Sequence, residues 1–292
     1  GWVGRLCENL LDRKIDYKIK IIHLTPDMYP RYMEKDKYNI GHLFWETDRL
    51  PKEWIAPINK MQEIWTSSPQ MADLFRNSGV TVPIYSFPQP VDISEADKPY
   101  ERYDIPEHKG FLFYSVFQWI ERKNPKTLLQ AYWETFTGRT DVSLLLKTYR
   151  VNYSEEEYQR IQSDIERWKR ESHLVHFPRV LLITKLLTHE DMMRLHYTGD
   201  CYLSADHGEG WSRPLQEALL MAKPAISTAR GGIHEYLDES FYYPVSSTYV
   251  PVVQQPWIPW YEGSQNWAQI DKEEFKNRMK FAFLNKNTAQ IK

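Results

Sequence analysis

Residues 207–228 read HGEGWSRPLQEALLMAKPAIST, and their pattern indicates the fold class. An apolar run over 201–206 precedes a glycine-bearing loop and a helical pattern, and a second apolar run over 224–228 precedes the loop RGG at 230–232. A strand, a loop and a helix that follow one another twice are typical of a parallel α/β sheet. Ligands of such sheets bind in the crevice at the carboxyl ends of the strands. We therefore predict that both loops open into one cleft.

The first loop has the composition of an anion-binding site. Gly208 and Gly210 let the backbone approach a ligand closely. The amides of Trp211 and Ser212 lead into a helix with Pro214 in its first turn, and free amides at a helix N-terminus bind phosphate. Taken alone, a glycine-containing turn of this kind is more often a feature of chain geometry.

The second loop and two glutamates extend the predicted site. Gly231 and Gly232 bring further amides to the same anion, with Arg230 as a charge partner. Glu209 precedes the helix and Glu217 lies one turn inside it, so we expect the two carboxylates to face the same crevice at different depths. Glu217 alone would more often be a solvated helix residue, so the prediction depends on the combination.

The combination resembles the motif of the retaining family 4 glycosyltransferases, which have the GT-B fold. That motif reads E-G-[FW]-x-x-P-x-x-E-A-x-x-x-x-x-P-x-I and ends in a glycine pair. The sequence matches it at Glu209, Gly210, Trp211, Pro214, Glu217, Ala218, Pro224, Ile226, Gly231, Gly232 and Glu235. The resemblance implies an α/β protein of GT-B fold, with two Rossmann-like domains whose parallel sheets face a cleft.

The resemblance also implies an activity, the transfer of a sugar from a nucleotide-sugar donor to a glycan, a lipid-linked sugar or another hydroxyl acceptor, with retention of configuration. Glu209 would hydrogen-bond the sugar hydroxyls and stabilise an oxocarbenium-like centre, and Glu217 would accept the ribose hydroxyls. No DxD-type metal motif stands in the right place, so we expect activity without a metal or a cofactor. The sugar, the base, the acceptor and the linkage do not follow from a local motif.

Residues 115–132, SVFQWIERKNPKTLLQAY, resemble the first strand, loop and helix of the donor domain in that family. Arg122 and Lys123 align with the basic pair that neutralises the donor diphosphate. Gln118 stands where the family usually has arginine, so further positive charge would have to come from another residue such as Lys147. Read without the family, this stretch is equally a solvated turn.

Three stretches nearer the N-terminus, at 41–54, 63–68 and 87–92, resemble the acceptor-side half of some of these enzymes. In GHLFWETDRLPKEW the polar candidates are His42, Glu46 and Asp48, which the resemblance places near the cleft on the acceptor side. His42 could equally be a core or edge histidine, and Asp48 a residue at a helix entry.

The chain of 292 residues is long enough for two modest domains. The polar segment 90–109 contains three prolines and is the best boundary. We expect an acceptor-side Rossmann-like domain over 1–95, a linker over 96–109 and a donor-binding domain over 110–292. The first domain opens with a helical pattern where a strand is usual, so we expect it to be incomplete, and the C-terminus also ends sooner than a GT-B chain usually does.

The secondary-structure pattern supports this division. We predict strands at 17–24, 38–45, 63–68, 83–89, 110–117, 142–149, 173–177, 201–206 and 224–228, and helices beginning near Pro51, Pro69, Asn124, Ser154, His189, Pro214 and Asp271. The start at Ser154 reads as a capping box, in which Glu157 reaches back to the cap.

Composition restricts the partners. The 37 basic and 39 acidic residues give a net charge of −2, so we expect no nucleic-acid partner. Cys7 and Cys201 lie far apart and suggest neither a zinc site nor a disulfide framework. No run reaches the roughly 18 to 20 apolar residues of a membrane-spanning helix. We expect a cytoplasmic protein, with peripheral membrane contact left open.

Alternatives remain at this stage. A catalytically silent protein of the same fold that binds sugar nucleotides is favoured by Gln118, whereas a Rossmann-type dehydrogenase or epimerase lacks its G-x-G-x-x-G motif. A paired-carboxylate hydrolase is disfavoured because both glutamates lie on one loop and its helix. The aromatic segment 256–267, with Trp257, Trp260, Tyr261 and Trp267, is either a carbohydrate-stacking platform or, more often for such segments, packing.

Overall fold

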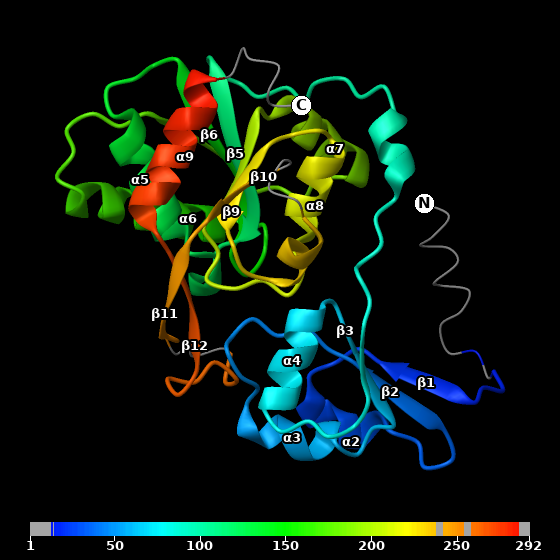
Figure 1. Cartoon of the computed structure of the whole chain (residues 1–292). Coiled ribbons are helices and arrows are strands. Elements are labelled where there is room, and N and C mark those ends of the chain that lie inside the picture. The colour runs from blue at the N-terminus through cyan, green and yellow to red at the C-terminus, as the bar shows by residue number, and fades with distance from the viewer. Residues whose placement is uncertain (1–12, 14, 238–241, 254–257, 286–292) are drawn as a thin grey trace.

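The computed structural model describes residues 13, 15–237, 242–253 and 258–285. The chain forms two α/β halves, one above the other in Figure 1. A parallel four-stranded sheet of order β1-β2-β3-β4 lies in the first half, and a parallel six-stranded sheet of order β10-β9-β8-β5-β6-β7 lies in the second. The predicted alternation of strands and helices around parallel sheets is confirmed.

The first half is built from short strands with helices between them. Its strands are β1 (Ile19–Ile22), β2 (Tyr38–His42), β3 (Glu63–Thr66) and β4 (Ile84–Ser86), and its helices are α2 (Tyr29–Tyr32), α3 (Lys52–Ile58) and α4 (Pro69–Asn77), with the 3-10 turn η1 (Pro26–Met28). Ser68 caps α4 by accepting a hydrogen bond from the amide of Met71. Trp54, Ile64 and Phe75 are fully buried in its core.

The second half is larger. Its strands are β5 (Phe111–Gln118), β6 (Val142–Tyr149), β7 (Arg179–Ile183), β8 (Cys201–Ser204), β9 (Ala225–Thr228) and β10 (Tyr242–Val245). Its helices are α5 (Pro125–Phe136), α6 (Glu155–Glu171), α7 (His189–Thr198), α8 (Arg213–Leu220) and α9 (Lys272–Leu284), with η2 (Ile93–Asp97), η3 (Glu121–Lys123) and η4 (Gly232–Tyr236). The strand order reverses between β5 and β8, which pair in parallel, and a ligand crevice is expected at such a reversal.

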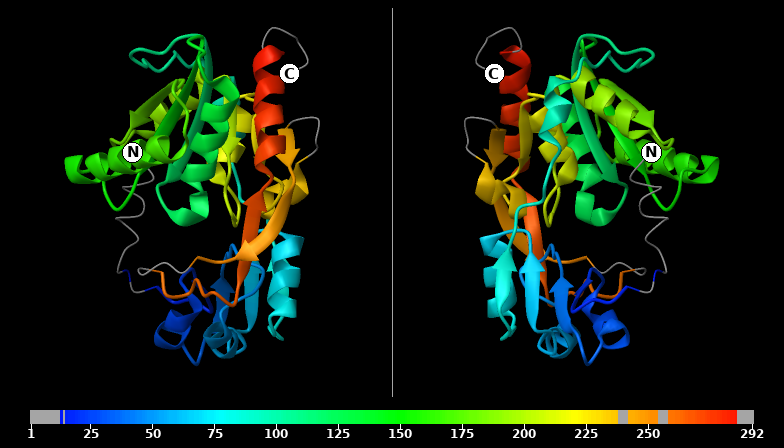
Figure 2. Two further views of the ribbon diagram at one scale, coloured as in Figure 1. Left: turned by 90° about the vertical axis from the view of Figure 1, so that its left-hand side faces the viewer. Right: turned by 90° about the vertical axis from the view of Figure 1, so that its right-hand side faces the viewer.

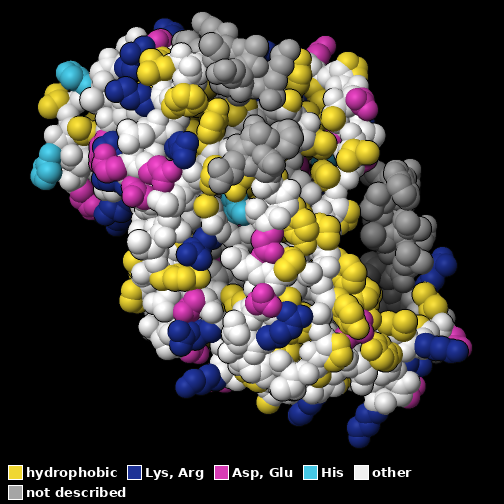
Figure 3. All heavy atoms as spheres, viewed as in Figure 1, with side chains coloured by type: hydrophobic (Ala, Val, Ile, Leu, Met, Phe, Trp, Pro, Cys, Tyr) yellow, Lys and Arg dark blue, Asp and Glu magenta, His cyan; other side chains and the backbone are white. Residues whose placement is uncertain are grey.

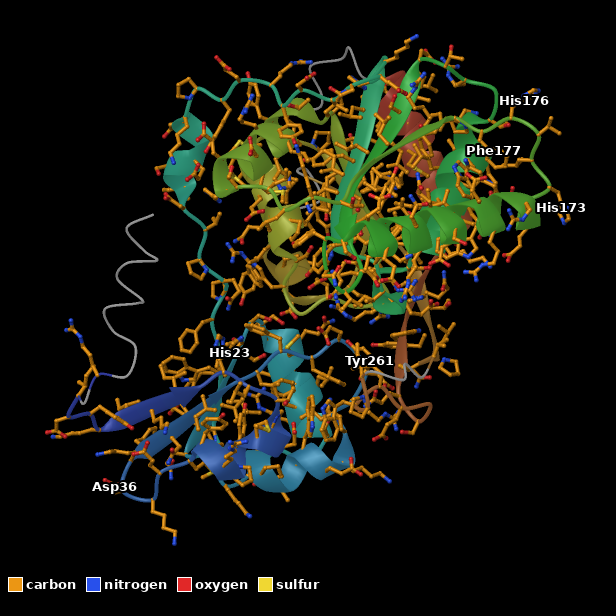
Figure 4. The ribbon with its side chains drawn as sticks, turned by 180° about the vertical axis from the view of Figure 1, so that it is seen from behind. His23, Asp36, His173, His176, Phe177 and Tyr261 are labelled. Carbon is orange, nitrogen blue, oxygen red and sulfur yellow. The ribbon has the colours of Figure 1, made fainter. Side chains whose placement is uncertain are left out.

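One predicted strand is wrong. Residues 173–177 run as a loop at the outer end of the second half, where Figure 4 labels His173, His176 and Phe177. The strand forms instead at β7, where Val180 pairs with Leu144. His173 has a φ of 58°, which ends α6 in the left-handed region. Pro178 has no amide to donate to a ladder, so pairing begins only after it.

The capping box at α6 is only half formed. Ser154 accepts a hydrogen bond from the amide of Glu157 at 3.4 Å, as predicted. The carboxylate of Glu157, however, lies toward arginines, 3.4 Å from Nη1 of Arg160 and 4.0 Å from Nε of Arg150. Ion pairing therefore replaces the return bond to the cap.

The connection between the halves docks on the second half. Glu95 in η2 contacts His189 of α7 at 3.2 Å, and the amide of Tyr103 donates to Oγ1 of Thr198 at 2.7 Å. Figure 1 shows this segment rising from β4 to lie beside α7. Part of the predicted linker 96–109 therefore packs as a component of the donor-side half, while the predicted domain boundaries themselves stay a prediction.

A hairpin joins the halves a second time. The antiparallel strands β11 (Ser247–Pro251) and β12 (Asn266–Ile270), which the sequence did not predict, extend toward the first half in both views of Figure 2. Tyr261 and Trp267 are almost fully buried there, and the Tyr261 ring lies 5.2 Å from that of Trp45. These two aromatic residues follow the packing interpretation, and Trp260 lies 5.3 Å from Trp54. The predictions for Trp257, Cys7 and residues 1–12 lie outside the described residues.

Candidate functional site

Five charged side chains meet between the two halves, and we call them the ion-pair cluster. Arg122 and Lys123 follow β5, Asp206 and Glu209 follow β8, and Glu46 follows β2. Nη1 of Arg122 lies 3.3 Å from Oε2 of Glu209, and its Nη2 lies 3.7 Å from Oε1 of Glu46. Lys123 pairs with Glu209 and, at 3.2 Å, with Oδ2 of Asp206. The carboxyl ends of three strands thus supply one cluster.

Burial and charge set the protonation of this cluster. Burial acts to raise the pKa of Glu209, but the charges of Lys123 and Arg122 outweigh it and hold the pKa below the usual range. The pKa of Asp206 is raised because burial outweighs the attraction of Lys123. Glu209 is therefore the firmly ionised carboxylate of the two, and it faces two cations.

The glycines of the first loop lie against the first half of the chain. A Cβ on Gly208 would stand 2.1 Å from the carbonyl oxygen of Glu46, and one on Gly210 would stand 2.8 Å from Cβ of Phe44. The sequence predicted that these glycines let the backbone approach a ligand. In the structure they allow the close approach of another loop of the protein, which brings Glu46 to the cluster.

The second loop packs on the first in the same way. Gly231 has a φ of 114°, and a Cβ there would stand 2.4 Å from the carbonyl oxygen of Glu209. A Cβ on Gly232 would stand 2.4 Å from the carbonyl oxygen of Gly210. Only glycine fits this φ and these distances without strain. The two predicted loops do meet, and their contact fixes the backbone of Glu209.

The turn into α8 is tight. Ser212 has a φ of 71°, and its side chain makes no capping bond. Trp211 is buried, and its Nε1 donates to Oε1 of Gln216 at 3.0 Å. The left-handed turn at Ser212 lets α8 start at Arg213, so the helix N-terminus follows Glu209 closely.

Glu209 and Glu217 lie in different surroundings. Glu209 belongs to the ion-pair cluster, whereas Oε2 of Glu217 lies 3.4 Å from Nε2 of His196. The side chain of Glu217 is 16% exposed. Glu217 is not among the residues that line the cavity described next, so a crevice shared by the two carboxylates stays a prediction.

A cavity of about 260 Å³ lies between the halves. Both halves contribute to it, since α4 forms one side and β11 another, and Figure 3 shows the halves in contact with charged side chains near their junction. Its lining includes Trp45, Glu46, Thr47, Asp48, Gln70, Met71, Asp73, Leu74, Asn77, His207, Gly208, Glu209, Arg230, Gly231, Tyr249 and Ala268. Four of these residues carry a carboxylate, namely Glu46, Asp48, Asp73 and Glu209, and one, Arg230, is an arginine.

The three acceptor-side candidates have different positions. Glu46 accepts a hydrogen bond from the hydroxyl of Tyr261 at 3.0 Å and lines the cavity. Asp48 also lines it, but its carboxylate accepts from the amide and side chain of Asn266 at 2.7 and 2.9 Å, which ties the loop to β12. His42 is not among the lining residues.

His42 takes part in a different group of rings. Its ring lies 4.6 Å from that of His23 and 4.8 Å from that of Phe44. Burial and the neighbouring His23 lower the pKa of His42. Figure 4 shows His23 at the side of the first half that is turned toward the second. His42 therefore lies near the junction of the halves without reaching the ion-pair cluster.

Gln118, which stands where arginine was expected, and Lys147, which was considered as a replacement for that charge, both make other contacts. Nε2 of Gln118 donates to the carbonyl oxygen of Arg150 at 2.9 Å. Lys147 is 4% exposed, and its Nζ lies 5.1 Å from the ring centre of Tyr153. Burial lowers the pKa of Lys147 to about 8.

Sequence reasoning missed Asp206 and His207. The ring of His207 stacks on Trp267 at 4.5 Å with an angle of 6° between planes, and its Nδ1 lies 2.6 Å from the carbonyl oxygen of Ala268. Asp206 could have been found, because it ends a predicted strand at the edge where ligands bind. The contact of His207 with β12 could not, because that hairpin was not predicted.

Neither a metal-binding cluster nor a membrane-spanning helix is found in the described part of the chain. Within it, no group of three or more His, Cys, Asp and Glu side chains is placed to hold a metal ion. The same residues contain no helix whose length and apolar character would let it cross a membrane.

Comparisons with known proteins identify the fold. No protein-family model and no curated protein sequence matches the chain. Among solved structures, it is similar to an α,α-trehalose-phosphate synthase from Burkholderia xenovorans with glucose-6-phosphate, at 14% identity and a TM-score of 0.66, over 99% of this chain and 71% of the other. It is also similar to TarM of S. aureus with UDP, at 14% identity and a TM-score of 0.63, over 96% and 52%.

A third similar structure is Anabaena HepE with UDP-glucose, at 15% identity and a TM-score of 0.55, over 77% of this chain and 65% of the other. The chain therefore spans about half the length of TarM and about two thirds of HepE. At these identities the comparison shows the fold alone. That fold is GT-B, with two Rossmann-like α/β halves, as the sequence predicted.

Proposed function

We propose that this chain forms the core of a retaining glycosyltransferase resembling family 4. It would move a sugar from a nucleotide-sugar donor to a hydroxyl of a glycan, a lipid-linked sugar or a similar acceptor. The observation that carries the proposal is the position of Glu209. This ionised carboxylate is held by Arg122 and Lys123 at the junction of the halves of a GT-B fold, where it lines the cavity between them.

In the proposed reaction, Glu209 and the two cations assist different parts of the transfer. The bond from the anomeric carbon to the diphosphate oxygen breaks, and the acceptor oxygen bonds to that carbon on the same face. The acceptor proton passes to the departing phosphate oxygen, so a nucleoside diphosphate and a glycoside are formed. Negative charge on Glu209 would stabilise the oxocarbenium-like centre, and the cations would stabilise the leaving group.

Arg122 still has a donor for this task. Its Nε is buried and lacks a hydrogen-bond partner among the described residues, while Nη1 donates to the carbonyl oxygen of Gly208 at 2.7 Å. A phosphate oxygen of the donor would satisfy that Nε–H. Because Arg122 and Lys123 supply positive charge, the proposal needs no metal ion and no cofactor.

Glu217 would bind the ribose of the donor. It lies on α8, the helix that begins directly after the loop of Glu209. Two of the similar structures contain UDP or UDP-glucose, so a uridine nucleotide is the first donor to test. Gly210, Trp211 and Ser212 would shape the donor loop, with Gly231 and Gly232 behind it.

On the acceptor side, we propose that Glu46 and Asp48 line the route of the acceptor hydroxyl. Both line the cavity that both halves enclose. His42 is kept as a candidate because it lies beside Phe44, which contacts Gly210 of the donor loop.

A catalytically silent protein that binds sugar nucleotides is the second candidate. Gln118 favours it, because its amide is bonded to the Arg150 carbonyl and offers no charge to a diphosphate. The two candidates share the fold and the donor loop, so only turnover separates them.

The test measures the release of UDP, GDP or ADP from a panel of their sugar conjugates, with and without hydroxyl acceptors. The transferase predicts that one donor is consumed and that Glu209→Ala abolishes turnover. Glu53→Ala, at an exposed glutamate of α3, is the matched control and should leave turnover intact. If no donor is consumed but one nucleotide binds tightly, the silent candidate is correct.

A further inference from the structure

A buried polar relay lies behind Glu217. The hydroxyl of Tyr114 on β5 lies 3.2 Å from Nδ1 of His196 on α7, and Nε2 of His196 lies 3.4 Å from Oε2 of Glu217 on α8. Tyr114 and His196 are fully buried. Two groups that water cannot reach therefore lead to a carboxylate that is partly exposed.

The chemistry of the three groups selects one tautomer of the histidine. An ionised carboxylate only accepts hydrogen bonds, so the ring is favoured when Nε2 carries the proton toward Glu217. Nδ1 then has a lone pair, which the Tyr114 hydroxyl satisfies as a donor. Burial raises the pKa of Tyr114 well above the usual value, so that hydroxyl keeps its proton.

The neighbouring rings hold His196 in place. The ring of Tyr114 lies 5.5 Å from that of His196 and 5.4 Å from that of Tyr202. A Cβ on Gly199 would stand 2.2 Å from Cδ1 of Tyr114, so the glycine at the end of α7 makes room for this ring. The ring of His196 also lies 6.4 Å from that of Tyr202, so the imidazole packs against two aromatic side chains.

The relay is incomplete without a rotation of Glu217. Nε2 of His196 is buried and has no hydrogen-bond partner of good geometry among the described residues. A core histidine with only a packing role would have its nitrogens satisfied by fixed neighbours. Here the partly exposed carboxylate of Glu217 lies 3.4 Å from Nε2, so it can satisfy this donor only when it takes one orientation.

We propose that His196 is a positioning residue that holds the Glu217 carboxylate in the orientation needed to accept the two ribose hydroxyls of the donor. This inference rests on the proposed function, in which Glu217 binds the ribose. Its consequence is specificity: the relay makes the protein prefer ribonucleotides over 2′-deoxyribonucleotides. Tyr114 supports the same role because its hydroxyl fixes the tautomer.

The test compares two substitutions that differ in which nitrogen they replace. The amide of His196→Gln reaches the place of Nε2 and can donate to Glu217, whereas that of His196→Asn reaches only the place of Nδ1. UDP, GDP and ADP are titrated against the full chain, and the tightest binder is compared with its 2′-deoxy form. The readout is the ratio of the two dissociation constants, which a general loss of stability does not change.

We expect the wild-type ratio to be on the order of ten- to a hundredfold, the effect of one charge-assisted hydrogen bond. It should fall toward one in His196→Asn and Glu217→Ala, and stay near the wild-type value in His196→Gln and in the exposed control His176→Asn. If His196→Asn does not fold, Tyr114→Phe tests the inference in its place, and the ratio measured for Tyr114→Phe should fall as well.

The inference is overturned if Glu217→Ala lowers the ratio but His196→Asn does not. If His196→Asn does not fold, an unchanged ratio in Tyr114→Phe overturns it in the same way. Either result leaves the proposed function standing. An unchanged ratio in Glu217→Ala overturns the ribose role of Glu217 and the relay together. Failure of all three nucleotides to bind the wild-type chain would overturn both the proposed function and the inference.

Discussion

The hydroxyl of Ser67, at the end of β3 in the first half, donates to the carbonyl oxygen of Gly210 in the second half at 2.6 Å. Ser67 and Gly210 are both buried. Gly210 follows Glu209 directly, so this hydrogen bond ties the backbone of the proposed catalytic glutamate to the opposite half of the fold.

Ser67→Ala should lower stability and turnover together. The Gly210 carbonyl would be left buried without its partner, which costs about 1–3 kcal/mol. Urea unfolding measures the loss of stability, and steady-state kinetics measures turnover. Ser264→Ala, at an exposed serine, should change neither quantity. An unaltered unfolding midpoint for Ser67→Ala would show that this contact does not hold the halves together.

Gly208→Ala should disrupt the junction more severely. The new Cβ would stand 2.1 Å from the carbonyl oxygen of Glu46, and a backbone atom cannot rotate away. We expect a loss of at least about 1–3 kcal/mol and displacement of Glu46 from Arg122. Gly263→Ala is the matched control, because a Cβ there meets nothing within 4 Å. Equal unfolding midpoints for the two variants would contradict the close approach.

Glu95 should make the attachment of η2 sensitive to acid. Burial acts to raise the pKa of Glu95, but hydrogen bonds from Lys98, Tyr100 and His189 outweigh it and lower the pKa to about 2. A carboxylate with a depressed folded-state pKa contributes stability above its unfolded value of about 4.3 and loses it as the pH falls toward the folded value. The wild type should therefore exceed Glu95→Gln in stability at pH 6.

That difference should shrink steadily between pH 4 and pH 2, as measured by urea unfolding at each pH. Glu101→Gln, at an exposed glutamate of the same connection, should show no such trend. A constant difference between wild type and Glu95→Gln across this range would mean that ionisation of Glu95 does not stabilise the connection.

Lys147→Met should stabilise the protein at pH 7. Burial lowers the pKa of Lys147 to about 8, so the folded state holds the proton less readily than the unfolded chain. Stability then rises with pH between about 8 and 10.4 in the wild type, and the substitution removes this dependence. The gain at pH 7 should be about 1–3 kcal/mol.

The same variant tests whether Lys147 replaces the arginine missing at Gln118. If turnover survives in Lys147→Met while stability rises, Lys147 is no phosphate ligand. A drop in turnover without a change in the pH dependence of unfolding would contradict the burial argument. Lys126→Met, at an exposed lysine of α5, is the control for loss of charge.

Several strands of the second half could be predicted because they are buried on both faces. β6 is almost wholly buried, and its apolar residues Val142 and Leu144 to Leu146 locate it although Lys147 and Thr148 follow them. β7 was misplaced because two apolar runs lie on either side of Pro178, and only pairing with β6 decides between them. The hairpin β11-β12 was missed because its residues show no regular alternation in exposure and because a long connection, not a short turn, separates the two strands.

The candidate site could be predicted only in part, because it combines local motifs with contacts between the two halves. Local motifs located Glu209, Arg122 and Lys123 and their loops, which follow neighbouring strands. Glu46 pairs with Arg122 across the two halves, and no spacing along the chain encodes that distance. Likewise, the glycines signalled a close approach, but which atoms approach depends on how the halves dock.

Substitution of Glu209 should lower turnover, whereas substitution of Glu217 should lower the affinity for nucleotide. Glu209→Ala removes the charge opposite Arg122 and Lys123, so turnover should fall by at least a hundredfold while nucleotide affinity stays the same or rises, because both cations are then free for phosphate. If Glu217 binds the ribose as proposed, Glu217→Ala removes hydrogen bonds of about 1.5–3 kcal/mol each, so the affinity for nucleotide should fall instead. Isothermal titration with UDP and single-turnover kinetics separate the two effects. Glu209→Gln keeps the volume and should be as inactive as Glu209→Ala, because the ionised charge is what the centre requires. Equal losses of affinity in both variants would contradict the division of sugar and ribose between these glutamates, since Glu209 pairs with Arg122 and Lys123, whereas Glu217 lies beside His196 and the exposed Arg213.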